Sequence, residues 1–238
     1  MMLQIDCFAS GSSGNLYRVD DGRTQILLEC GIPFREIQRY LKFKVGSLAA
    51  CLITHEHKDH CKAVLDMMLM GVRCWMSKGT AAVLELPDRP PIMTIADKET
   101  ALIGTWQVTA FNTQHDSAEP LGFLLDNGRD RILYATDTYY LKYRFPACTV
   151  MMLECNHSYE IIDRKVASGS LLPSMARRLT KSHFSLENLK SFLKANDLSQ
   201  VREIYLIHLS DANSDEEKFK YEIAALTGKP VIVAPKRG

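Results

Sequence analysis

The feature that most constrains this chain is the segment Thr54–His60, which reads Thr-His-Glu-His-Lys-Asp-His. The short apolar run at residues 49–53 predicts a buried strand before it. The run at residues 61–70, which ends at Gly71, predicts a helix after it. The histidine-rich segment therefore lies at a strand-to-helix junction, where the chain is extended or turning.

Alternate side chains of an extended segment point the same way, so we expect His55, His57 and Asp59 to converge on one side. His60 would open the helix and approach from another direction. Imidazole and carboxylate ligands suit zinc, manganese or iron, and three of them on one side with a fourth at the turn favour two neighbouring metals once later ligands join them. The alternative is a histidine-rich surface loop, but this register arises by chance in on the order of one in a few thousand chains.

Composition bounds what kind of protein this is. With 238 residues, 46% hydrophobic and 24% charged, the chain is typical of an ordinary globular protein, and we interpret residues 1–238 as a single domain. No apolar run approaches the roughly 18 residues of a membrane helix, and the N-terminus has no signal-peptide pattern, so we expect a cytoplasmic protein without membrane contact. A net charge of +1 excludes an overall basic field of the kind that dedicated nucleic-acid binders carry. The seven cysteines form no CxxC pair and are interpreted as reduced core residues.

Polar residues recur just past the ends of apolar strands. His115, Asp137 and His208 each follow a run that predicts a strand, as the histidines of the first segment do. Strand ends along one edge of a sheet are where a site can be assembled from distant parts of a chain. Strands dominate both halves, and helices follow strands near the middle and the end, so the pattern predicts two mixed sheets with helices outside.

This order of motifs resembles the metallo-β-lactamase superfamily. The matching pieces are Leu28–Gly31, the HxHxDH motif of His55–His60, and the later residues His115, Asp137 and His208. The resemblance spans essentially the whole chain. It implies an α/β fold of the αββα type, a sandwich of two mixed β-sheets flanked by helices, with a site for two divalent metals.

The resemblance also implies which residues bind these metals. The first metal would be bound by His55, His57 and His115. The second would be bound by Asp59, His60 and His208, with Asp137 bridging the two. Zinc is the usual occupant of such sites, and manganese and iron occur as well.

A narrower resemblance is to the YycJ/WalJ-type branch of this superfamily. It rests on Phe8–Asn15, the pair His115–Asp116, the segment Glu154–His157 and Leu206–Ser210. That branch is regarded as acting on DNA, with 5′-to-3′ exonuclease activity. The bridging aspartate also favours phosphodiester hydrolysis over β-lactam hydrolysis, where a cysteine typically holds that position.

Two departures from the family pattern bear on the site. Glu29 replaces an aspartate that supports the site from behind its ligands, and the extra methylene could loosen ligand positioning. Taken without the resemblance, an acidic residue at this turn is more often solvated. Ser182–Ser185 stands where the branch has a Gly-His-Leu-Ser-Asn segment. His157 and His183 are therefore either structural histidines or residues that touch the substrate. Glu56 and Lys58, which alternate with the motif histidines, are expected to face solvent.

The leading hypothesis is a phosphodiesterase that cleaves DNA as an exonuclease. A hydroxide bridging two metals would attack phosphorus, Asp59 and Asp137 would orient it, and His183 would protonate the leaving oxygen. The alternatives are a hydrolase of small or cyclic nucleotides, and a metal-binding partner protein without turnover.

The basic side chains of Arg177, Arg178 and Lys181 stand just before His183. They either contact backbone phosphates of a nucleic acid or form a solvated helix face. The oligomeric state and the metal used in the cell are not determined by the sequence.

Overall fold

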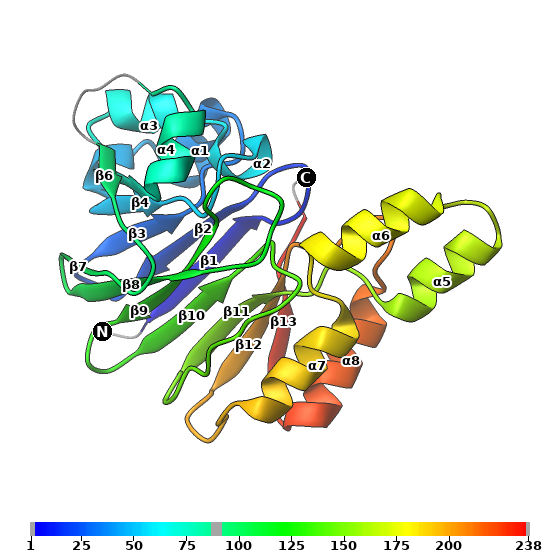
Figure 1. Ribbon diagram of the computed structural model, residues 1–238. Coiled ribbons are helices and arrows are strands. Elements are labelled where there is room, and N and C mark those ends of the chain that lie inside the picture. The colour runs from blue at the N-terminus through cyan, green and yellow to red at the C-terminus, as the bar shows by residue number, and fades with distance from the viewer. Residues whose placement is uncertain (1–2, 87–91, 237–238) are drawn as a thin grey trace. The chain divides into compact units, whose positions relative to one another are not determined.

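The computed structural model describes residues 3–86 and 92–236 (Figure 1). In these residues the strands form two mixed β-sheets, one of six and one of seven strands, and helices flank them, which confirms the predicted fold class. The chain divides into two compact units. The first comprises Met1–Asn112, Ser117–Arg129 and Pro235–Gly238, and the second comprises Thr113–Asp116 and Asp130–Ala234. The single domain over residues 1–238 stays a prediction.

The first unit contains the six-stranded sheet, whose strands follow one another in chain order. They are β1 (Gln4–Ala9), β2 (Leu16–Asp20), β3 (Gln25–Leu28), β4 (Ala50–Leu52), β5 (Cys74–Met76) and β6 (Ile92–Thr94). The first three strands pair antiparallel, and β3 to β6 pair parallel. The same unit holds the antiparallel strands β7 (Thr100–Ile103), β8 (Trp106–Asn112) and β9 (Leu121–Asp126).

Short helices follow the parallel strands of the first unit. They are α1 (Phe34–Tyr40), α2 (Lys58–Cys61), α3 (Val64–Leu69) and α4 (Lys78–Val83), with a 3₁₀ turn at Val45–Ser47. Cys30, Cys51 and Cys74 are fully buried, and all seven cysteines are free, as predicted. Cys7 is partly exposed, so it is not a core residue.

The second unit is a parallel αβ arrangement. Its strands, in the hydrogen-bonded order β13-β12-β11-β10, are β10 (Arg131–Ala135), β11 (Val150–Glu154), β12 (Glu203–Ile207) and β13 (Val231–Val233). Its helices are α5 (Tyr159–Ala167), α6 (Pro173–Ser182), α7 (Leu186–Ala195) and α8 (Glu216–Thr227). Every residue of β11 is buried, as expected of a parallel strand that is covered on both faces. Helix α8 packs beside β13 and against α7 (Figure 1).

One predicted helix is divided in two. The sequence predicts a helix over residues 61–70, but the structure has α2 and then α3, which start at Lys58 and Val64. Ala63 separates them with φ −102° and ψ 15°, and its N–H donates to the carbonyl of Cys30 at 2.9 Å instead of continuing the helix. Asp59 therefore lies in α2, so the prediction that it continues the extended segment is wrong.

One further expectation, that the chain has no membrane helix, can be compared with the described residues. No helix among them is long and apolar enough to cross a membrane. The sequence also predicts a chain break at Pro87, Pro90 and Pro91, which lie outside the described residues.

Candidate functional site

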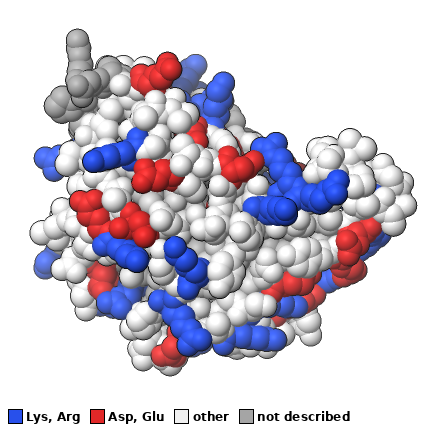
Figure 2. All heavy atoms as spheres, viewed as in Figure 1, with Lys and Arg blue, Asp and Glu red and all other residues white. Residues whose placement is uncertain are grey.

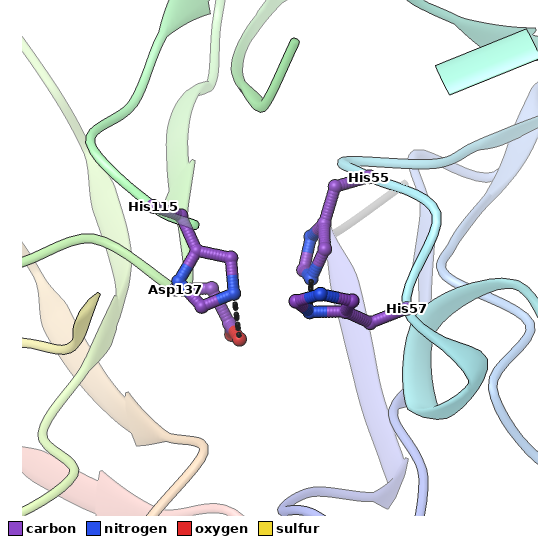
Figure 3. Close-up of side chains that lie close together, drawn as sticks. All are labelled: His55, His57, His115 and Asp137. Atoms are coloured by element: carbon purple, nitrogen blue, oxygen red, sulfur yellow. Dashed lines mark hydrogen bonds and ion pairs between the residues drawn. The ribbon is translucent and has the colours of Figure 1, made fainter. Parts of the chain in front are cut away.

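The HxHxDH cluster comprises His55, His57, Asp59 and His60 of the first unit. His55 follows β4, and His57 is the extended N-cap residue of α2. Nε2 of His55 lies 3.0 Å from Nδ1 of His57 (Figure 3), and the rings of His55 and His60 lie 4.2 Å apart by their centroids. Nε2 of His60 lies 3.4 Å from Oδ2 of Asp59. The short first turn of α2 thus gathers three imidazoles and one carboxylate.

Hydrogen bonds from the residue before β2 and from the segment after β3 hold this cluster. Asn15 donates two hydrogen bonds to the carbonyl of Asp59, one from its backbone N–H at 2.8 Å and one from its side-chain Nδ2 at 3.1 Å. The backbone N–H of Cys30 donates to the carbonyl of His60 at 2.8 Å. A Cβ atom on Gly31 would lie 1.7 Å from the carbonyl oxygen of Asp59. Only glycine permits this approach of the two backbones. Asn15 and Gly31 therefore position the motif, although the sequence alone shows no periodicity that marks them.

Glu29 supports the same cluster from below. Its side chain is fully buried, so the expectation of a solvated turn residue is wrong. Oε1 lies 3.4 Å from Nδ1 of His60, and Oε2 accepts the N–H of Thr54 at 3.3 Å. Its φ of 63° lies in the left-handed region, where a residue with a long side chain is uncommon. The longer side chain still reaches the motif histidine.

Glu56 and Lys58, which alternate with the motif histidines, differ in their exposure to solvent. Lys58 is exposed, as expected. Glu56 is only partly exposed, because its Oε1 accepts the N–H of Ala118 at 2.7 Å. The expectation that Glu56 faces solvent is therefore wrong, and its carboxylate instead fixes the loop before β9.

The Glu154 cluster lies in the second unit and comprises His115, Asp137, Glu154, His183 and His208. Asp137 and His208 come just after β10 and β12, and Glu154 ends β11 between them. Ligand atoms of Asp137, Glu154, His183 and His208 all lie within 4.8 Å of one another. Parallel strands end at one edge of a sheet, which is why residues so far apart in sequence meet here.

Glu154 is the centre of this cluster. It is fully buried, and its Oε1 accepts Nδ1–H bonds from His183 at 2.6 Å and from His208 at 3.0 Å. Its Oε2 accepts the backbone N–H groups of Thr138 and Phe184, each at 3.0 Å. Burial by itself would raise the pKa of this carboxyl, but the charge of His183 and these hydrogen bonds lower it to about 2. Glu154 is therefore a buried carboxylate at neutral pH.

Glu154 belongs to the segment Glu154–His157 of the narrower resemblance, but no role in the site is predicted for it from the sequence. One signal could have found it, because it ends an apolar strand in the same way that Asp137 and His208 follow theirs. By holding Nδ1–H of His208, it leaves Nε2 of that ring as the atom with a lone pair for a metal. A carboxylate behind a histidine ligand orients the ring in this way in metal sites.

Asp137 and His208 both have backbone conformations that side chains rarely adopt. Their φ angles are 48° and 53°. Such conformations persist where the surroundings determine them strongly, and they concentrate at functional sites. Oδ1 of Asp137 accepts the hydroxyl of Thr136 at 2.7 Å, and Oδ2 lies 3.4 Å from Nε2 of His115 (Figure 3).

His115 is held in one orientation by α6. Its Nδ1 donates to the carbonyl of Ser182 at 2.9 Å, which leaves Nε2 toward Asp137. Burial lowers the pKa of His115, and the nearby Asp137 only partly opposes this. Asp116 reinforces the arrangement, because it accepts the hydroxyl of Ser182 at 3.0 Å. A neutral imidazole with a fixed tautomer is the form that binds metals.

His183 is the C-cap residue of α6 and is mostly buried, with 17% of its side chain exposed. Burial would lower its pKa, but the charge of Glu154 and the hydrogen bond between them raise it. Its ring stacks on that of His208 with centroids 5.5 Å apart. Glu154 thus favours the charged form of a histidine that lies next to Asp137 and His208, and the role of His183 as a general acid stays a prediction.

His157 has a different environment. It is fully buried, and neither ring nitrogen has a hydrogen-bond partner among the described residues. Burial lowers its pKa to about 4. Its backbone bridges to Ser185, which ties the segment after β11 to the start of α7. A structural histidine is expected to form hydrogen bonds, and the ring of His157 has none among the described residues, so both interpretations of this histidine stay predictions.

Helix α6 carries the predicted basic residues on an exposed face. Lys and Arg side chains gather over this helix (Figure 2), where Arg177, Arg178 and Lys181 are exposed. Arg178 forms an ion pair with Asp116 at 2.9 Å. Its charge is therefore partly compensated, and the pair links α6 to the segment that carries His115.

Each cluster taken alone has the donors of a divalent-metal site. The HxHxDH cluster offers imidazole nitrogens and the Asp59 carboxylate, and the Glu154 cluster offers imidazole nitrogens, Asp137 and a carboxylate behind His208. No thiol belongs to either group. This donor set suits zinc, manganese or iron more than soft copper(I) or the all-oxygen sites of calcium.

Comparisons with known proteins agree with this chemistry. A family model described as "Beta-lactamase superfamily domain" matches residues 24–209. The exodeoxyribonuclease YycJ of Bacillus anthracis is 25% identical over 240 residues, which cover 94% of this chain and 89% of the relative. The exodeoxyribonuclease WalJ of Streptococcus pneumoniae serotype 2 is 26% identical over 226 residues, which cover 88% of this chain and 82% of the relative.

A solved structure supports the fold. The metallo-β-lactamase fold protein YhfI from Bacillus subtilis aligns with a TM-score of 0.77 at 14% identity, covering 99% of this chain and 97% of that chain. Together these matches confirm the resemblance to the superfamily and to its YycJ-like branch.

Proposed function

Because the chain belongs to the β-lactamase superfamily, whose fold implies divalent metal ions and hydrolytic chemistry, we propose that it is a DNA exonuclease acting in the 5′-to-3′ direction. The two relatives named exodeoxyribonucleases support a DNA substrate. The observation that carries the proposal is the Glu154 cluster, in which one buried carboxylate orients two histidines beside Asp137. In this proposal Asp137 and His208 would bind metal, and His183 would donate a proton.

The proposed metal ligands are those that the family resemblance implies. They are His55, His57, Asp59, His60, His115, Asp137 and His208. Bound divalent metals supply positive charge that stabilises the transition state of phosphodiester hydrolysis, and they acidify water. The chain keeps its ligands ready for this task through Glu154, which fixes the His208 ring, and through the Ser182 carbonyl, which fixes His115.

His183 would donate the proton that the leaving oxygen needs. Its Nδ1–H is bonded to Glu154, so the opposite nitrogen, Nε2, is the atom that can release a proton. Glu154 raises the pKa of His183, which keeps the ring protonated over a wider pH range. Activity should therefore fall as the pH rises through this raised pKa, because the acid form is lost.

The experiment is release of mononucleotides from 5′-phosphorylated duplex DNA by protein reconstituted with manganese or zinc. We expect release by the wild type and a loss of about 100-fold or more in Asp137→Asn. Asparagine keeps the volume and tolerates the positive φ of this position, so the variant removes mainly the charge. Asp59→Ala serves as a second inactive control, and label at either end of the strand determines the direction.

Each other outcome points to a specific alternative. Hydrolysis of small or cyclic nucleotides without release from DNA would overturn the nuclease proposal and leave a phosphodiesterase. Full metal occupancy without hydrolysis of any phosphodiester would favour a partner protein without turnover.

A further inference from the structure

The second unit contains a cavity of about 390 Å³ that none of the proposed ligands lines. One wall is the segment 140–144 after β10, and the other is the face of α7 that carries Asn188, Ser191 and Phe192. Phe184 closes it at the end of α6. Its size is that of a small-ligand site, and its lining suggests which ligand.

Aromatic rings form the floor and one rim of this cavity. Phe184 and Phe192 are buried with ring centroids 6.1 Å apart, and Phe145 lies behind Phe192 at 6.2 Å. Tyr140 stands at the rim with 56% of its surface exposed. A rigid aromatic floor holds the walls in place, while an exposed tyrosine ring offers a free face. Nucleobases stack on such rings irrespective of sequence.

The charge of the cavity is positive. Lys142 and Arg144 are exposed at its edge, and no aspartate or glutamate lines it. Neither cation forms an ion pair with another described residue. The ammonium group of Lys142 lies over the Tyr143 ring, 5.0 Å from its centroid. Uncompensated cations beside exposed aromatic rings are the features with which proteins bind a single strand.

The cavity is connected to the Glu154 cluster by two short stretches of chain. Thr138 donates its N–H to Glu154, and its hydroxyl donates to the carbonyl of Tyr140 at 2.8 Å. Phe184 follows His183 directly and also donates its N–H to Glu154. Tyr140 is three residues from Asp137, a separation of at most roughly 11 Å between their Cα atoms. One strand could therefore occupy the cavity and reach Asp137.

We propose that this cavity binds the base of an unpaired nucleotide next to the scissile phosphate. The base stacks on Tyr140, and Lys142 and Arg144 contact the flanking phosphates. This inference rests on the proposed nuclease function, for which it identifies a single-stranded segment as the form of DNA that the chain holds. A duplex end would have to separate by at least one base pair to be bound.

The test is binding of a fluorescent, single-stranded oligonucleotide with phosphorothioate linkages, measured by anisotropy with the full chain. Tyr140→Ala should weaken binding about tenfold, and Tyr140→Phe should restore it, because the ring and not the hydroxyl carries the stacking. The matched control is Tyr221→Ala on α8, where the tyrosine is 74% exposed and far from the cavity in sequence. It should bind like the wild type.

A second oligonucleotide lacking one base separates stacking from a general loss of structure. The wild type should prefer the complete strand over the strand with an abasic position, and Tyr140→Ala should lose that preference.

Lys142→Gln should lower the salt dependence of binding by about 0.7 in log–log slope, as expected for one phosphate contact, while Lys220→Gln should not. Unchanged affinity and base preference in Tyr140→Ala would overturn the proposal.

The failure of this inference can be told from failure of the nuclease proposal. If the wild type releases nucleotides from DNA but Tyr140→Ala binds the oligonucleotide normally, only the cavity is wrongly assigned. If the wild type releases none, the nuclease proposal fails, whatever the binding result.

Discussion

The two histidine clusters of this chain are built in different ways. The HxHxDH cluster comes from one segment of the first unit, and its position depends on backbone contacts made by Asn15, Cys30 and Gly31. The Glu154 cluster comes from five separate segments of the second unit, and a single side chain connects three of them. The HxHxDH cluster is therefore positioned by neighbouring backbone segments. The Glu154 cluster is positioned by one side chain that accepts hydrogen bonds from several segments.

The same difference appears in the carboxylate behind each cluster. Glu29 lies 3.4 Å from one histidine and accepts the N–H of Thr54 at 3.3 Å, whereas Glu154 accepts four hydrogen bonds of 2.6 to 3.0 Å, two of them from histidines. Removing an acceptor shared by two histidines leaves both rings without the group that orients them, which costs more than removing a carboxylate that lies at a longer distance from one histidine. We therefore expect different substitutions to disrupt the arrangement of the two clusters.

The largest effect should come from Gly31→Ala, which breaks the support of the HxHxDH cluster. A methyl group 1.7 Å from the Asp59 carbonyl forces α2 away from β3, so we expect the free energy of unfolding to fall by about 3 kcal/mol or more. Chemical denaturation measures it. Gly46→Ala is the control, because an added Cβ at Gly46 has no neighbour within 4 Å. Equal stability of the two variants would contradict this account of the support.

Glu154→Gln should break the Glu154 cluster. The amide keeps the volume but presents an NH₂ group to donors, so we expect a loss of about 3 kcal/mol in the free energy of unfolding and about 100-fold in activity. Glu160→Gln, a surface glutamate in α5 that is 60% exposed, should change neither by much. Near-normal activity in Glu154→Gln would show that the histidines are held by other contacts.

His157, near the Glu154 cluster, should make the stability of the protein depend on pH. Its pKa is about 4 when folded and 6.5 for a histidine exposed to water, so the unfolded chain binds the proton more readily between these values. His157 should therefore cost stability as the pH falls from about 6.5 to 4, by about 3 kcal/mol in all. Unfolding of the wild type and of His157→Gln across this range measures it. The same pH slope in both would contradict the prediction.

The smallest effect should come from α6. Arg178→Gln removes an exposed ion pair with Asp116, and we expect the free energy of unfolding to change by less than about 1 kcal/mol.

Arg177→Gln should leave the free energy of unfolding unchanged but lower the salt dependence of duplex binding by about 0.9 in log–log slope if this arginine contacts a phosphate. An unchanged slope in Arg177→Gln would show that this arginine does not contact a phosphate.

Much of the fold was predictable, because its strands are short apolar runs separated by turns. The apolar pattern of residues 186–195 predicts a helix, which agrees with α7, and the apolar run 204–207 before His208 predicts a strand, which lies within β12. The division of the helix over residues 61–70 was not predictable from local pattern. It depends on Ala63 donating to the carbonyl of Cys30, a contact between residues distant in sequence.

The sequence by itself determined the superfamily and the candidate ligands, because the HxHxDH spacing and the strand-end residues are local patterns. Only the tertiary structure decided that Glu154 is a shared acceptor, that Glu29 is buried, and that His157 lacks hydrogen-bond partners among the described residues. The reason is physical. Burial and hydrogen-bond partners depend on which strands lie side by side, and no window of consecutive residues contains that information.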